Sequence, residues 1–167
     1  MLISWNQTTW QSGEDPIHDI VISVREADGS EFLAPWKFTN GDADNHFYHA
    51  SQTRLSGNDL SFLSYIHNGQ VVFNRFNSYG SIVTGETHIT DSGDANNPDA
   101  MMLSTGDILV AWEEISDTRE ITFDILDGDT YLSILPGPIE LTNPADGYNQ
   151  FVSVTADSNG HGILTWT

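Results

Sequence analysis

Asp94-Ala95-Asn96-Asn97 is the central copy of an Asp-x-x-Asn pattern that recurs at one fixed interval in this chain. The three copies are Asp42 with Asn45, Asp94 with Asn97, and Asp146 with Asn149. The aspartates at 42, 94 and 146 are spaced by 52 residues. Self-similarity at a period of about 50 residues in a strand-rich chain is typical of a propeller or an array.

The segments on either side of the central copy are apolar or alternating, with turn residues between them. Residues 99–103, 108–112, 120–126 and 131–141 are expected to form four strands, here named A to D, and helical periodicity is not seen. The same order returns at 47–53, 60–66, 71–76 and 81–90. It returns without strand A at 2–5, 17–25 and 31–38, and as strands A and B only at 151–155 and 162–166.

Strand B is apolar on both faces, as Ile108 to Trp112 shows, so it is expected in a sheet that is covered on both sides. Its four copies end in an aromatic residue, namely Trp5, Tyr65, Trp112 and Trp166. We expect these four side chains to occupy equivalent buried positions.

The repeat predicts an all-β fold, a β-propeller of four-stranded antiparallel blades with about three blades per chain and permuted termini. Residues 1–45 would form a blade lacking strand A, 46–95 and 96–147 complete blades, and 148–167 strands A and B of a further or shared blade. Propellers need about four to eight blades. Either two chains form a six-bladed homodimer or the chain belongs to a longer propeller, and a single-chain β-sandwich is a third possibility.

The charge balance limits the partners. Asp and Glu number 24 against 5 Lys and Arg, so the formal net charge is −19. Nucleic acid and anionic membrane surfaces are disfavoured, because both are bound through clustered basic residues. Cysteine is absent, which excludes disulfides and thiolate chemistry, and no apolar stretch is long enough to insert in a membrane. A multivalent cation, a neutral glycan or a basic protein patch remains as partner.

The chain from Asp94 to Pro98 and from Leu103 to Trp112 resembles the Trp-ending repeats of about 50 residues in large bacterial secreted and RTX-type proteins, and the later copy from Asp157 to Trp166 fits them as well. That resemblance implies a β-propeller and an extracellular or cell-surface location. It implies no activity, because those repeats share no catalytic set and propellers carry many functions.

The Asp-x-x-Asn copies are expected in the connections between strand D and the next strand A, where Asp and Asn form turns. The alternative is a set of ligand or calcium sites, to which the chain would contribute part of an oxygen shell. The metal candidates are Asp42, Asp94 and Asp146, and the ligand-binding candidates are Asn45, Asn97, Asn149 and Trp10. Trp10 belongs to the longest loop, 6–16, which antiparallel order places on the same face.

No catalytic motif is found, and the pair Glu113-Glu114 is interpreted as a solvated strand end. His46 and His49 point to opposite faces of an extended segment, while His18, His67, His88 and His161 occupy non-equivalent repeat positions, which favours structural or solvated roles. We therefore predict a non-enzymatic module for glycan or protein binding or for scaffolding. The alternative is a carbohydrate-active propeller enzyme that uses acidic loop residues.

Overall fold

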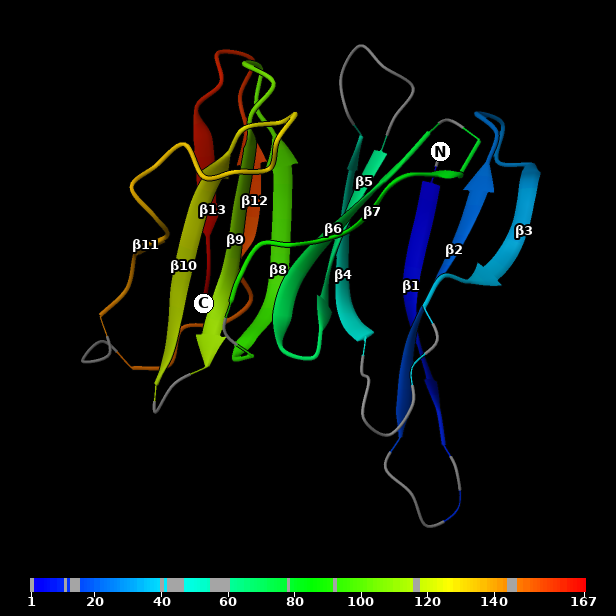
Figure 1. Cartoon of the computed structure of the whole chain (residues 1–167), viewed down its shortest axis with the longest axis horizontal. Coiled ribbons are helices and arrows are strands. Elements are labelled where there is room, and N and C mark those ends of the chain that lie inside the picture. The colour runs from blue at the N-terminus through cyan, green and yellow to red at the C-terminus, as the bar shows by residue number, and fades with distance from the viewer. Residues whose placement is uncertain are drawn as a thin grey trace.

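The computed structural model describes residues 2–10, 12, 16–39, 41, 61–77, 79–91, 93–115, 118–143 and 147–167, and of residues 47–54 the backbone (Figure 1). Its strands are β1 (Leu2–Thr9), β2 (Ile17–Arg25), β3 (Glu31–Lys37), β4 (Phe47–Arg54), β5 (Ser61–His67), β6 (Gln70–Phe76), β7 (Ile82–His88), β8 (Ala95–Met102), β9 (Ile108–Ile115), β10 (Arg119–Leu126), β11 (Ile139–Glu140), β12 (Ser153–Ala156) and β13 (Gly162–Thr165). No helix occurs among these residues, so the predicted all-β class is confirmed.

The strands form four antiparallel sheets in chain order. They are β1-β2-β3, β4-β5-β6-β7, β8-β9-β10-β11 and β12-β13. The two complete sheets each contain strands A to D as consecutive neighbours, the first sheet lacks strand A, and the last consists of strands A and B. The order of strands within each sheet therefore follows the sequence repeat.

The sheets stack face to face in a row (Figure 1), and apolar side chains fill the three spaces between them. Strand β5 shows how one strand serves two of these spaces. Phe62 and Ile66 face the third sheet, whereas Leu63 and Tyr65 face the first, because successive side chains of a strand point to opposite faces. Burial on both sides explains why strand B is apolar throughout.

The prediction for the four aromatic residues at the ends of strand B is right for two and wrong for two. Tyr65 and Trp112 are 1% and 2% exposed, while Trp5 and Trp166 are 40% and 41% exposed. Tyr65 faces the sheet that precedes its own, and so does Trp112. Trp5 lies three residues after Leu2, which packs against the second sheet, so Trp5 points the other way, where the described strands form no further sheet.

Two further expectations need correction. Strand D of the third sheet, expected at 131–141, is reduced to β11 and one bridge between Leu126 and Ser133. Pro136 and Pro138 lie in this stretch, and proline has no N–H to donate to a neighbouring strand. Also, Asn97 is not in a turn before strand A but inside β8, at a register shift between Asn96 and Asp99.

Candidate ligand-binding face

One end of the sheets carries the residues that the sequence singles out. We call it the loop face and define it as the end where β1, β5, β9 and β13 finish and where β4, β8 and β12 begin (Figure 1). Trp10 follows β1 directly, Asp94 precedes β8, and Asn149 precedes β12. Antiparallel pairing brings these positions to the same end, as predicted. The loop expected at 6–16 is shorter than predicted, because β1 continues to Thr9. Asp42, Asn45, His46 and Asp146 lie outside the described residues, as does the side chain of His49.

Asn97 and Asn149 are hydrogen-bonded within the chain. Asn97 has a φ angle of +43°, in the left-handed region that Asn tolerates better than most residues, and its Nδ2 donates to Oε1 of Glu113 at 2.5 Å. Asn149 donates from Nδ2 to the carbonyl oxygens of Gly147 at 3.3 Å and Arg119 at 3.4 Å. A ligand that binds either amide would have to replace these bonds.

Glu113 is the centre of a buried polar cluster. The prediction that this residue belongs to a solvated strand end is therefore wrong. Its side chain is 0% exposed. Oε1 also accepts a hydrogen bond from the backbone N–H of Phe151 at 2.7 Å, and Oε2 accepts one from Nη1 of Arg119 at 3.2 Å. Glu114 points to the other side, where Oε2 accepts a bond from Nε1 of Trp112 at 2.9 Å. Glu113 thus ties the segment that leads into β12 to strand β9.

In the first sheet, Asp19 likewise binds the backbone of the segment that follows strand D. Its buried carboxylate accepts bonds from the backbone N–H of Gly41 at 2.6 Å and from Nζ of Lys37 at 2.5 Å. Burial alone raises the pKa of Asp19, but the bonds from Gly41 and Lys37 outweigh it and hold that pKa below its ordinary value. On the loop face, buried carboxylates thus hold two of the segments that follow a strand D: Asp19 holds the one at Gly41, and Glu113 holds the one at Phe151.

The candidates that remain accessible are Asp94 and Trp10. Asp94 is exposed, and among the described residues it belongs to no group of three or more ionisable metal ligands. The calcium hypothesis for this position therefore stays a prediction. Trp10 is 77% exposed, and Tyr148 and Phe151, which precede β12, are also well exposed. The described part of the loop face thus presents several large aromatic side chains to water.

A group that sequence reasoning missed lies at the end of the second sheet: His67 of β5 with Glu86 and His88 of β7. Nδ1 of His67 contacts Oε1 of Glu86, and Nε2 of His88 lies 3.6 Å from the same oxygen. Beneath them, burial and the nearby charge of Glu86 raise the pKa of Tyr65. The sequence signal that could have revealed part of this group is Glu86-Thr87-His88. Residues two apart on a strand share a face, so this stretch places Glu86 and His88 side by side.

No protein-family model and no curated protein sequence matches this chain. Among solved structures, it is similar to one described as the crystal structure of a thermostable family-43 glycoside hydrolase, with a TM-score of 0.47 and 12% sequence identity. The superposition covers 96% of this chain and 64% of that one, so the chain spans less than two thirds of the length of its structural neighbour. In the described part of the chain there is no helix that is long and apolar enough to cross a membrane.

Proposed function

We propose that the chain is a non-enzymatic β-propeller module, extracellular or on the cell surface, that binds a neutral glycan or a protein through the loop face. The observation that carries this proposal is the exposure of Trp10, Tyr148 and Phe151 at that face. Exposed aromatic rings provide flat apolar surface with few side-chain torsions to immobilise. A sugar ring or an apolar protein patch suits such a surface.

The net charge of the chain limits the classes of ligand that can bind. With a formal net charge of −19, an acidic polysaccharide would be repelled, whereas a neutral glycan or a basic protein would not. Repeated blades present similar groups several times, so weak contacts can add through avidity. Asp94 and its counterparts Asp42 and Asp146 are proposed as calcium ligands that would make binding depend on this cation.

Binding without turnover on an array of neutral glycans is the expected result, with Trp10→Ala weakening the binding by about tenfold or more, as for a hot-spot aromatic residue. The matched control is Tyr79→Ala, because Tyr79 is 66% exposed and follows β6 at the opposite end of the sheets. The array is run with calcium and with a chelator. Equal binding by both variants would contradict the assignment of the loop face.

An assay for hydrolysis of the same glycans distinguishes the non-enzymatic module from the alternative, a carbohydrate-active enzyme. The enclosed position of Glu113 supports the non-enzymatic proposal, since both of its oxygens are hydrogen-bonded inside the chain. Turnover on the array would overturn that proposal and favour a carbohydrate-active propeller that uses acidic loop residues.

We further propose that the outer sheets are completed by a second copy of the chain, as in a six-bladed homodimer, or by further sequence of a longer propeller. Strand β1 pairs only with β2 and β13 only with β12 among the described strands, which leaves open backbone edges. Trp5 faces the side where another sheet would lie.

Self-association of the isolated chain is therefore expected, with a mass in solution above the 18.5 kDa of one chain. Ile163→Lys should shift the mass towards the monomer, because a charge on an edge strand opposes strand pairing. Leu132→Lys, at an exposed site outside the strands, is the control. A monomeric parent chain, measured by light scattering across a range of concentrations, would refute the prediction.

A further inference from the structure

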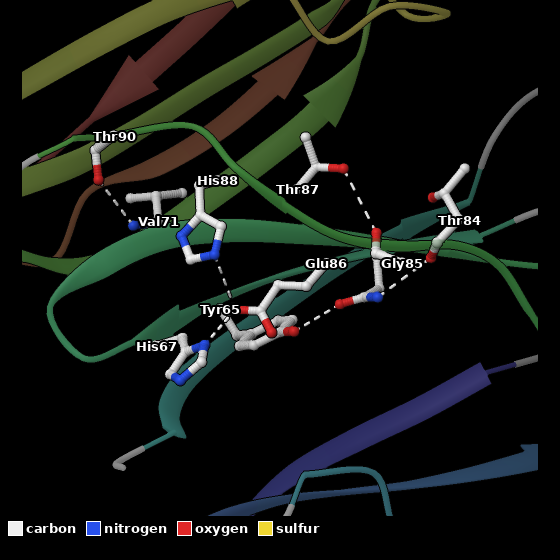
Figure 2. A network of polar contacts seen from close by, with 10 residues as sticks. Tyr65, His67, Val71, Thr84, Gly85, Glu86, Thr87, His88 and Thr90 are labelled. Carbon is white, nitrogen blue, oxygen red and sulfur yellow. Dashed lines mark hydrogen bonds and ion pairs between the residues drawn. The ribbon is translucent and has the colours of Figure 1, made fainter. Parts of the chain in front are cut away.

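Two imidazole rings and one carboxylate converge at the end of the second sheet. Figure 2 shows the carboxylate of Glu86 between the rings of His67 and His88. One ligand atom of each residue lies within 4.8 Å of a ligand atom of each of the other two. Nδ1 of His67 contacts Oε1 of Glu86, and Nε2 of His88 lies 3.6 Å from the same oxygen. It is the one such group of three among the described residues.

The sheet itself creates this arrangement. Strands β5 and β7 flank β6, and Val72 of β6 pairs with Tyr65 on one side and with His88 on the other. Glu86 and His88 are two residues apart and share a face of β7, while His67 ends β5 two residues after Tyr65. The centroids of the two imidazole rings are 6.1 Å apart. The second sheet therefore fixes the directions of all three side chains.

We propose that His67, Glu86 and His88 form a binding site for a divalent late transition-metal ion such as Zn²⁺. Zinc takes imidazole nitrogen and carboxylate oxygen at about 2.0 to 2.2 Å, so tetrahedral ligand atoms lie about 3.3 Å from each other. The separation of 3.6 Å between Nε2 of His88 and Oε1 of Glu86 is close to that value. Calcium prefers a shell of six to eight oxygens, which two imidazoles cannot supply.

The surroundings favour an ion with an open coordination position. All three side chains are partly exposed to water, so an ion can enter without unfolding the sheet. Below them Tyr65 is buried, and its hydroxyl donates to Oδ1 of Asn74 at 2.6 Å, which keeps that side rigid. An entering ion would replace the direct contact between His67 and Glu86. With three protein ligands, a water molecule or a ligand group would complete the shell.

Titration of the full chain with ZnCl₂, followed by calorimetry, tests the site directly. One zinc ion per chain is expected, together with a rise in the thermal midpoint, because a ligand of the native state stabilises it. His88→Ala and Glu86→Gln should each weaken zinc binding by more than about tenfold, since loss of a group that merely orients a ligand costs about 10- to 100-fold. His161→Ala is the matched control, because His161 is exposed and hydrogen-bonded to Asp157 instead.

Zinc affinity that is equal in the parent chain, His88→Ala and Glu86→Gln would overturn the proposal, and so would displacement of zinc by an equal concentration of calcium. Circular dichroism establishes that each variant is folded, and Glu86→Gln, which keeps the side-chain shape, decides the matter if His88→Ala does not fold. Co²⁺ offers a second readout: its visible absorption should change in Glu86→Gln and stay the same in His161→Ala. Glycan binding is measured separately, so its failure would not affect this test.

Discussion

Trp112→Ala is expected to lower the free energy of unfolding by about 3 to 5 kcal/mol, the range for deleting a core aromatic side chain. Trp112 is 2% exposed and packs in the space between the second and third sheets, together with Phe62, Ile66 and Phe73. Its removal would leave a cavity where two sheets meet, and neither sheet can close that cavity without disturbing its own strand pairing. Urea denaturation monitored by circular dichroism measures the loss.

The repeat supplies an unusually close control for this substitution. Trp166 ends the last copy of strand B, as Trp112 ends the third, but it is 41% exposed. Trp166→Ala removes the same atoms from the corresponding place in the repeat and should cost less, because less apolar surface is lost from the core. Equal losses for the two variants would show that burial between sheets is not what makes Trp112 important.

The sequence predicts most of the strands because their signals are local. Gly106 and Gly160 both follow a strand and both have positive φ angles, which glycine adopts without strain. The alternation between polar and apolar residues from Glu120 to Ile125, within β10, marks a strand by itself. Local signals fail where tertiary contacts decide the conformation. Asparagine is a turn-forming residue, which is why a turn was expected at Asn97. In the structure Asn97 lies inside β8, at a register shift in the pairing of β8 with β9.

The polar clusters were harder to predict, because their members are far apart in sequence. Glu113 looks like half of an exposed acidic pair until Phe151, 38 residues later, is brought next to it. His67 and Glu86 are 19 residues apart and meet because a third strand lies between theirs. Alternation along a strand gives the face of each side chain, but it does not give the neighbour across the sheet. The loop face was therefore predictable, whereas its hydrogen bonds were not.

Glu113→Ala is expected to destabilise the chain by about 3 kcal/mol or more, the lower part of the range for breaking a buried ion pair. The substitution leaves the Arg119 guanidinium without its carboxylate and removes the acceptor for the Phe151 N–H and the Asn97 amide. Arg119 is 33% exposed and can regain water, which keeps the loss from reaching the top of the range. The two neutral donors are less able to do so.

The neighbouring glutamate is the control, because Glu114→Ala removes an identical side chain that is partly exposed and accepts a hydrogen bond from Trp112. Its cost should be about 1 kcal/mol, typical of one hydrogen bond. Hydrogen exchange gives the local readout: the Phe151 amide should lose protection in Glu113→Ala and keep it in Glu114→Ala, since only the first variant removes its acceptor. If both variants were equally stable and the Phe151 amide exchanged at the parent rate, Glu113 would not be what holds the segment before β12 to the third sheet.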